Sequence, residues 1–266
     1  MSLPKGSEFT YGVHARSVLG LVKDNKATIM EPAEAASVLE KMSGMLMGSV
    51  RSLNDTYELL RQGIAYTLPF KLHEGKLHFL VYKRTKRNNE GRLAEKLSLA
   101  PGGHIEGRDL SYYMIDDGTG LMVESDTICW GDTLMRNMTR ELCEEVDFTS
   151  KYFEHTERHI GLMASAGAKA IGFVMDSKPE IGFVGNTHIG IIHAAQVPSD
   201  AGFVMKDEYN TSVGWMIAED LLDHVLGKKS LADGENGPVP FEPWSEMIIG
   251  QIEKVEQVLW QAFDGQ

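Results

Sequence analysis

The stretch Arg140-Glu141-Leu142-Cys143-Glu144-Glu145 says more about fold and chemistry than any other part of this 266-residue chain. It lies in a segment with helical periodicity, Leu134 to Val146. At about 100° per residue, the three glutamates fall on one face of the helix, and apolar residues gather on a neighbouring face. These apolar residues are Met135, Met138, Leu142 and Val146. The sequence therefore predicts a helix that packs one side into a core and presents an acidic side.

The acidic side predicts a metal site. Like charges three or four residues apart on a helix are mutually destabilising, so carboxylates placed this way repel each other unless a cation lies between them. Hard divalent ions such as Mg²⁺ or Mn²⁺ prefer carboxylate oxygens as ligands. The alternative is a helix face that is simply solvated, because glutamate-rich faces are common on soluble proteins and this chain has a net charge of −12.

A glycine-rich turn, Pro-Gly-Gly-His-Ile-Glu-Gly at 101–107, lies upstream of the acidic helix. Together the two segments resemble the signature of the Nudix hydrolases. That signature reads G, five residues, E, seven residues, R-E-U-x-E-E-x-G-U, where U is a bulky aliphatic residue, and it forms a loop, a helix and a loop. In this chain Gly103 would open the signature, and its second half would be formed by Arg140, Glu141, Leu142, Glu144, Glu145 and Phe148.

The chain departs from the signature in three places. Eight positions are expected between the first acid and the arginine, whereas Asp109 and Arg140 are thirty-one apart, which leaves twenty-three extra residues. The first acid is an aspartate, either Asp109, counted from the glycine, or Asp132, counted back from the arginine. We favour Asp132, because the residues at 130–133 are typical of a helix start with an acidic first turn. Finally, Asp147 replaces the last glycine, and aspartate tolerates the left-handed conformation better than most residues.

The resemblance implies an α/β fold, namely a Nudix-type α/β/α sandwich around a mixed β-sheet with a C-terminal helix. We expect a single domain spanning the whole chain, in which residues 1–61 elaborate a core at 62–266; a separate N-terminal lobe is the alternative. An insertion at 107–130 splits the signature. Its Asp-Asp-Gly-Thr-Gly at 116–120 predicts a hairpin or surface flap. Residues 181–193 resemble a MutT-like branch of the family whose members are described only as predicted phosphoesterases.

Periodicity elsewhere predicts alternating strands and helices. Strands are expected at Tyr11–Leu21, Ile64–Leu72, Leu77–Tyr82, His159–Leu162, Ala170–Met175 and His188–Val197. Helical segments are expected at Pro32–Met47, Thr56–Gln62, Met216–Leu226 and Pro243–Phe263.

Nudix hydrolases cleave a diphosphate linked to another moiety. Water attacks phosphorus, and divalent metals neutralise the developing charge and orient the water. The resemblance implies that Glu141 and Glu145, one turn apart, are ligands of Mg²⁺ or Mn²⁺. Glu144 would bind a metal or accept the proton of the attacking water. Arg140 would orient a glutamate through a charge-assisted hydrogen bond, and the backbone carbonyl of the glycine pair ending at Gly103 would complete the metal shell.

Three further residues are candidates for substrate contact, each with a structural alternative. His104 follows the glycines and would touch phosphate, unless its role is purely structural. Glu208 lies in the loop before Trp215, where some Nudix enzymes keep a general base; the alternative is an exposed loop glutamate. Trp215 would stack on a base or pack in the core. His188 lies in an expected strand, where a buried histidine with its hydrogen bonds satisfied is favoured over a ligand.

Composition limits the classes of partner. The net charge argues against a surface for polymeric DNA or RNA, which requires a basic stripe. A nucleotide remains compatible, because bound metals offset phosphate charge. The chain has no apolar run of about 18 residues that would predict a membrane span, and Met1–Thr10 has no apolar signal-peptide region, so a cytoplasmic location is expected. Cys129 and Cys143 have no metal-ligand spacing.

These observations lead to one favoured function and two alternatives. The favoured hypothesis is a metal-dependent pyrophosphohydrolase acting on a small nucleotide-like diphosphate, with a homodimer as a family-level expectation. A non-catalytic nucleotide-binding or sensor domain of the same fold is the second hypothesis, motivated by the insertion and the two aspartate departures. A glutamate face that is wholly structural is the third.

Overall fold

The structure is a computed structural model, and it describes residues 9–18, 20–21, 27–43, 46–50, 60–86, 93–151, 162, 164–175, 187–206, 208–234 and 237–263. At its centre is a ten-stranded mixed sheet. Its strands are β1 (Phe9–His14), β2 (Thr28–Ile29), β3 (Leu46–Val50), β4 (Leu60–His73), β5 (Lys76–Arg84), β6 (Leu97–Ser98), β7 (Gly102–His104), β11 (Lys169–Val174), β12 (His188–Gln196) and β14 (Asn210–Ile217). The main order is β14-β5-β4-β12-β11-β2, and β1, β3, β6 and β7 join beside it.

The hairpin of β4 and β5 is the frame of this sheet. Glu74 and Gly75 both have positive φ, 50° and 73°, as the tight two-residue hairpin turns require. This confirms the paired strands expected at 64–72 and 77–82. On the other side of β4, strand β12 runs parallel to it over the whole of its length. The side chains of β12 are nearly all buried, because helices cover both faces of the sheet here.

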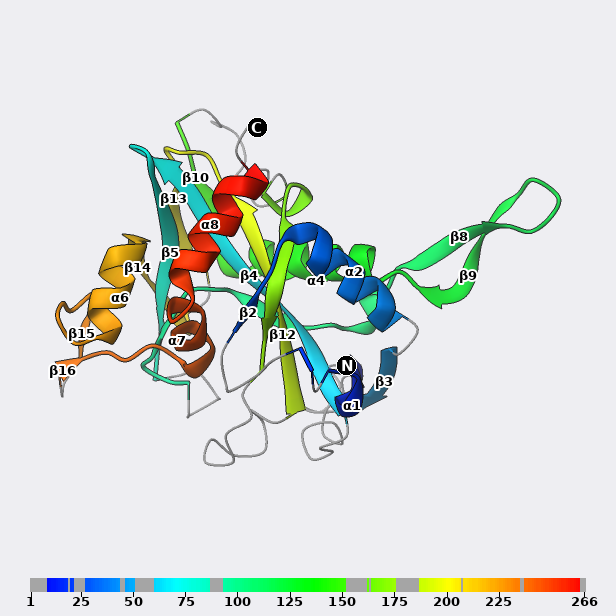
Figure 1. Cartoon of the computed structure of the whole chain (residues 1–266), viewed down its shortest axis with the longest axis horizontal. Helices are drawn as coiled ribbons and strands as arrows, with labels where there is room; N and C mark the ends of the chain where they lie inside the picture. The colour runs from blue at the N-terminus through cyan, green and yellow to red at the C-terminus, as the bar shows by residue number, and fades with distance from the viewer. Residues whose placement is uncertain are drawn as a thin grey trace.

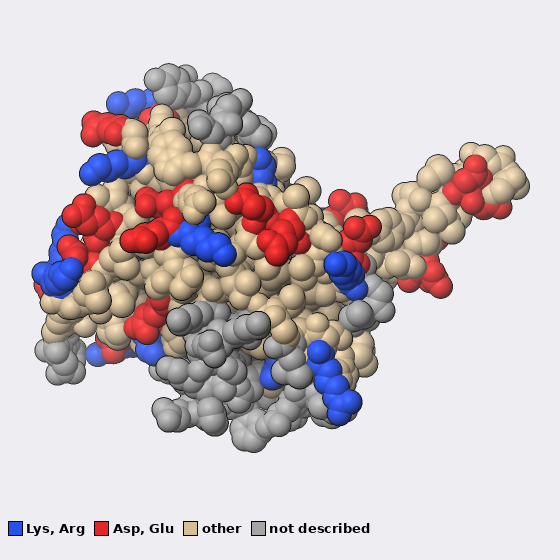
Figure 2. All heavy atoms as spheres, viewed as in Figure 1, with Lys and Arg blue, Asp and Glu red and all other residues tan. Residues whose placement is uncertain are grey.

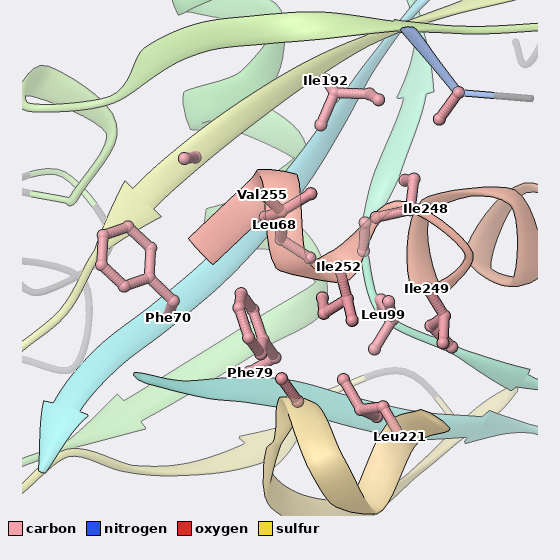
Figure 3. Packing of buried hydrophobic residues seen from close by; sticks show 14 of the residues in the cluster. Leu68, Phe70, Phe79, Leu99, Ile192, Leu221, Ile248, Ile249, Ile252 and Val255 are labelled. Carbon is pink, nitrogen blue, oxygen red and sulfur yellow. The ribbon is translucent and has the colours of Figure 1, made fainter. Parts of the chain in front are cut away.

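The helices form two outer layers, which confirms the predicted α/β/α sandwich (Figure 1). One face of the sheet carries α6 (Ala218–Val225), α7 (Pro243–Ile249) and α8 (Ile252–Phe263). Figure 3 shows part of the hydrophobic cluster on this face, in which Phe70 and Phe79 of the sheet are packed with Ile248, Ile252 and Val255 of the last two helices. Each such buried side chain stabilises the fold by about 1.5–3 kcal/mol relative to exposure. The other face carries α2 (Pro32–Ser43) and α4 (Trp130–Glu145).

Helix α4 contains the acidic stretch, and it begins earlier than its periodicity indicated. Trp130, at its first position, is almost fully buried. At the other end the chain passes directly into β10 (Val146–Thr149), which pairs with β13 (Gly202–Met205). The residue after the helix, Val146, is extended with φ −129°. The helix therefore does not end in a left-handed residue at Asp147, and this explains why no glycine is needed there.

The insertion forms a protruding hairpin, as expected (Figure 1). Its strands are β8 (Tyr112–Asp116) and β9 (Met122–Ile128). The turn contains two glycines with positive φ, Gly118 and Gly120, and their N–H groups both donate to the Asp116 carboxylate. Before the hairpin, the chain makes a single turn of 3₁₀-helix, η1 (Gly107–Asp109).

Several predicted boundaries in the N-terminal part are wrong. The strand expected at Tyr11–Leu21 is β1, followed by the short helix α1 (Ala15–Val18). The helix expected at Pro32–Met47 ends at Ser43, and β3 begins at Leu46. Residues 60–62 of the expected turn at Thr56–Gln62 belong to β4, and the rest lies outside the described residues. Most of His159–Leu162 also lies outside them.

The C-terminal part brings two further corrections. The single helix expected at Pro243–Phe263 is two helices, separated at Gly250 and Gln251. Ile249 at the end of the first helix and Ile252 at the start of the second are both buried. The helix expected from Met216 begins at Ala218, because the two residues before it complete β14. A small two-stranded hairpin, β15 (Asp233–Gly234) and β16 (Gly237–Pro238), precedes α7. Within the described ranges, none of the helices has the length and apolar character needed to cross a membrane.

Candidate active site

The candidate site forms where β7, η1 and α4 meet, and two adjacent glycines make this meeting possible. Gly103 pairs with Ala65 of β4. A Cβ on Gly102 would lie 2.2 Å from the Ala65 carbonyl oxygen, and a Cβ on Gly103 would lie 2.2 Å from Oε1 of Glu141. The first glycine therefore lets β7 approach the sheet, and the second lets a carboxylate of α4 pack against the backbone.

Arg140 joins three segments through one guanidinium group. Its Nε and Nη2 each donate to an oxygen of Asp109, at 2.9 Å and 2.9 Å, and Nη2 also donates to the carbonyl of His104 at 3.1 Å. Its Nη1 donates to Glu141 at 2.6 Å and to Glu144 at 3.3 Å. The planar fork of arginine suits this paired recognition of a carboxylate. We call these residues the Arg140 network.

Of the two candidates for the first acid, Asp109 contacts the arginine. Its side chain is 3% exposed, and it also accepts hydrogen bonds from Asn137 and from the backbone of Glu106. Burial raises the pKa of Asp109, but the hydrogen bonds from Arg140 and from the Glu106 backbone lower it by more, so it lies below its ordinary value. Asp132 is exposed in the first turn of α4. The geometry therefore favours Asp109, against the preference drawn from the sequence.

The three glutamates of α4 point to different surroundings. Glu141 is 12% exposed and lies against the glycine turn. Burial raises its pKa, although Arg140 acts in the opposite direction. Glu144 is half exposed and lies 3.7 Å from Nη1 of Arg108. Glu145 is partly buried, and its charge helps to raise the pKa of Arg84 of β5. The acidic face thus extends from the glycine turn to the central sheet.

The electrostatic balance of the site is negative. Within the Arg140 network and its neighbour Arg108, two guanidinium groups face four carboxylates, so the formal charge is +2 − 4 = −2 when all are ionised. The carboxylates are those of Glu106, Asp109, Glu141 and Glu144. An excess of this kind favours a bound cation.

The oxygen atoms of the acidic face are ligands of the type that a hard divalent cation prefers, but they do not converge on one point. In the part of the chain that the structure describes, no three His, Cys, Asp or Glu side chains form a group that could hold a metal ion. However, Glu141 and Glu145 are one helical turn apart, and Gly103 leaves its backbone open to Glu141. Their carboxylate oxygens and the backbone carbonyl of Gly103 are the hard donors that such a cation prefers.

The side chain of His104 turns away from the glutamates. Its Nε2 lies 2.8 Å from Nε2 of the buried His188, and Nδ1 of that residue lies 3.1 Å from the hydroxyl of Thr187. The backbone carbonyl of His104, rather than its ring, therefore contacts Arg140. This arrangement corresponds to the structural alternative for both histidines.

The other two substrate candidates lie on the chain at and before β14. Glu208 is exposed, and its carbonyl accepts a hydrogen bond from Thr85 at 3.4 Å. Trp215 belongs to β14, where its ring packs edge-on against Phe203 at 5.3 Å between centroids, and Lys71 lies over the ring. The ring also packs against the hydrophobic cluster that contains Leu142 and Val146 at the end of α4, which corresponds to the packing alternative for Trp215.

Sequence reasoning missed Asn137. This fully buried side chain donates to the carbonyl of His104 at 2.8 Å and to Asp109 at 3.0 Å, and it accepts from the backbone of Ala65 at 3.3 Å. It thus connects α4, η1 and the sheet. The available signal was its position one turn before Glu141, which places both on one side of the helix.

Comparison with known proteins identifies the fold. No protein-family model and no curated protein matches the chain. Among solved structures, Tm1382, a candidate Nudix hydrolase, superposes with a TM-score of 0.60 at 15% identity, covering 93% of this chain and 100% of that one. The Nudix domain of Shewanella oneidensis NrtR, complexed with ADP ribose, gives 0.39 at 15% identity over 74% and 88%. A Nudix hydrolase from Alicyclobacillus acidocaldarius gives 0.40 at 13% over 71% and 96%. The first of these superpositions shows that the chain has a Nudix-type fold.

Proposed function

We propose that this chain is a metal-dependent hydrolase of the Nudix type, which cleaves the diphosphate bond in a small nucleoside diphosphate linked to another moiety. The Arg140 network carries this proposal. One partly buried arginine ties the glycine turn and Asp109 to two glutamates of α4, although the insertion separates the two segments in sequence. A purely solvated glutamate face does not require such a connection.

The reaction needs an activated water and neutralisation of charge. The oxygen of water attacks one phosphorus, the bond from that phosphorus to the bridging oxygen breaks, and the other phosphate leaves with that oxygen while a base takes a proton from the water. Glu141, Glu145 and the Gly103 carbonyl would hold Mg²⁺ or Mn²⁺. Such an ion, when bound, lowers the pKa of water and offsets phosphate charge. Glu144, half exposed, is the carboxylate best placed to accept the proton from a water on the solvent side.

Arg140 acts as a positioning residue in this proposal. It holds Glu141 against the glycine turn, and its two hydrogen bonds to Asp109 keep the guanidinium in place. When the glutamates turn toward a cation, Arg140 therefore stays fixed. This separates the part of the site that must be rigid from the part that moves.

A small substrate agrees with the surface. On the described part of the face in Figure 2, acidic and basic side chains are interspersed and do not gather in a basic stripe. With the net charge of −12, this supports a single nucleotide-like ligand and not polymeric nucleic acid.

One observation favours a second function, nucleotide binding without cleavage. The described carboxylates form no group of three around a common point. Two of the glutamates, Glu141 and Glu144, form ion pairs with Arg140. A domain that kept this arrangement with ligand bound would sense a nucleotide without hydrolysing it.

The test is a hydrolysis screen with two matched variants. The purified protein would be incubated with a panel of nucleoside diphosphate derivatives, including ADP-ribose, in Mg²⁺ or Mn²⁺, and phosphate measured with a coupled phosphatase. Glu145→Gln should lower turnover by about 100-fold or more, because it removes a proposed ligand of the ion that offsets the developing charge. Asp132→Asn removes one exposed carboxylate of the same helix and should leave turnover unchanged. Binding of nucleotide and metal without any product would favour the sensor, and a Glu145→Gln variant as active as the wild type would remove the proposed site.

A further inference from the structure

The central sheet divides between β4 and β5. These strands pair with each other only near their turn, from Phe70 opposite Phe79 onward. Farther from the turn, β4 pairs with β7, where Tyr66 faces Gly102, and β5 pairs with β6, where Tyr82 faces Ser98. The two strands diverge, so the space between their branches must be filled by side chains. We call this region the fork.

A buried carboxylate lies in the fork. Glu242, the residue before α7, is 5% exposed. It accepts hydrogen bonds from the hydroxyls of Tyr66, of Ser98 at 2.5 Å and of Ser245 at 3.3 Å. Burial raises the pKa of Tyr66 well above its ordinary value, so this hydroxyl keeps its proton and remains a donor. Burying a carboxylate is costly unless it is paired and hydrogen-bonded, and these hydroxyls supply part of that compensation.

Arg84 supplies the opposite charge. Its Nε lies 3.4 Å from Oε2 of Glu242, and its Nη2 donates to the hydroxyl of Tyr82 at 3.3 Å. The side chain is 18% exposed, so it is held by the fork yet reaches the surface. Burial opposes its charge, but Tyr82 and Glu242 raise the pKa of Arg84 by more, and it lies above its ordinary value. The guanidinium therefore stays charged.

The fork adjoins the acidic helix. Tyr82 packs in one hydrophobic cluster with Leu142 and Val146 at the end of α4. Arg84 is two residues farther along β5 and so points to the same side of the sheet. The charge of Glu145 also helps to raise the pKa of Arg84. The acidic face is thus bordered by Arg140 at its Glu141 end and by Arg84 at its Glu145 end.

We propose that Arg84, aligned by Glu242, binds a phosphate group of the substrate beside the acidic face. This inference rests on the proposed function and names a binding residue for it. Glu242 already balances the charge of Arg84 and fixes the orientation of its side chain, so little conformational entropy is lost when a phosphate binds. Guanidinium recognises phosphate through paired hydrogen bonds that lysine cannot reproduce.

The test measures binding of methylenediphosphonate, a diphosphate mimic that is not hydrolysed, to the full chain with Mg²⁺ present. Isothermal titration would compare the wild type with Arg84→Lys, Glu242→Gln and Arg136→Lys. Arg136 is exposed on α4, where it donates to the Leu110 carbonyl, so it controls for the arginine-to-lysine change. We expect Arg84→Lys to weaken binding about tenfold or more, because a charge-assisted bond is lost. Glu242→Gln should weaken it less, and Arg136→Lys should leave it unchanged.

Thermal unfolding of each variant separates binding from stability. Weaker binding by Arg84→Lys at a temperature where it remains folded supports the proposal. Binding equal to the wild type overturns it, as does a wild type that does not bind the diphosphonate. Should the lysine variant fail to fold, Glu242→Gln gives the same comparison with Arg84 retained: weaker binding supports the proposal, and equal binding overturns it.

The two proposals fail in different ways. Turnover that is lost in Glu145→Gln, combined with unchanged diphosphonate binding in Arg84→Lys, would keep the hydrolase and overturn the phosphate-binding role. Binding that depends on Arg84, with no turnover on any substrate of the panel, would support the role of Arg84 in binding and point to the sensor function.

Discussion

Residues 102–110 and residues 112–128 adjoin in sequence but differ in what they contact. The first segment is tied to the rest of the molecule through the glycine pair and through Asp109, which binds Arg140. The second segment pairs with itself as the β8–β9 hairpin. Several of its large apolar side chains are about half exposed, including Met114, Ile115 and Met122.

The difference shows where an insertion can enter a site without destroying it. The two ends of the hairpin meet, since Tyr112 pairs with Ile128 and the N–H of Cys129 donates to the carbonyl of Ser111 at 2.7 Å. The chain therefore returns to the point from which it left. Asp109 lies before this point and α4 begins after it, so the sequence separation grows while the contact between Asp109 and Arg140 is kept.

The largest effect should come from removing the acid that crosses this boundary. Asp109→Ala removes the acceptor of two Arg140 hydrogen bonds and of one Asn137 hydrogen bond. It leaves the Arg140 charge without its most buried partner, and we expect a loss of about 3 kcal/mol in the free energy of unfolding. Asp132→Ala removes an exposed acid from the first turn of α4 and should cost about 0.5 kcal/mol, through the helix dipole alone. Urea unfolding of the two variants beside the wild type measures both values.

The opposite order of the two losses in stability would contradict the proposed difference between the two segments. A large loss for Asp132→Ala, together with a small loss for Asp109→Ala, would mean that the residues after the hairpin supply the first acid. In that case the segment before the hairpin would be connected to α4 only through the glycine turn.

The sequence could predict the acidic helix, but it could not decide between the two acids. Helical periodicity placed Glu141, Glu144 and Glu145 on one face whatever the surrounding fold. The choice of acid depended on residue spacing within the signature. Because of the insertion, the spacing counted forward from Gly103 gives Asp109, whereas the spacing counted back from Arg140 gives Asp132. The helix-start signal at 130–133 was correct, since α4 does begin at Trp130, but a helix start does not indicate which acid reaches Arg140.

The fork was beyond sequence reasoning for a related reason. Tyr66, Ser98 and Glu242 come from three distant parts of the chain, and only the divergence of β4 from β5 brings them together. The amphipathic pattern did predict a helix from Pro243, and α7 begins there. It gave no sign that the residue before the helix is buried, because burial depends on what packs against that end.

The next largest effect on stability should come from Gly102, and it should exceed that of the adjacent Gly103. In Gly102→Ala the new methyl group would meet the backbone carbonyl of Ala65 at 2.2 Å, so β7 must move away from the sheet. We expect a loss of about 2 kcal/mol in the free energy of unfolding. In Gly103→Ala the three atoms nearest to the new group all belong to the end of the Glu141 side chain, which can rotate, and the loss should be about 1 kcal/mol or less.

Turnover should rank these two variants differently from stability. Gly103→Ala displaces the carboxylate that the proposed metal site needs, so it should lose turnover while remaining folded at assay temperature. Unfolding curves and the hydrolysis assay on the same preparations would show this. A Gly103→Ala variant with full turnover would mean that the contact between Glu141 and the turn has no part in the reaction, and the first segment would then be only structural.

The smallest effect should come from shortening the hairpin. Replacing residues 114–126 by Asn-Gly, which favours a two-residue hairpin turn, keeps Tyr113, whose side chain lines a cavity of about 460 Å³ between α2 and α4. Because the removed residues pair only with each other, the melting temperature should change by less than about 2 °C. If specificity resides in the insertion, the shortened protein will hydrolyse the panel with a different order of preference at the same stability. A melting temperature lowered by more than about 5 °C would contradict the comparison, because it would show that the hairpin stabilises the contact between Asp109 and Arg140 instead of projecting freely from it.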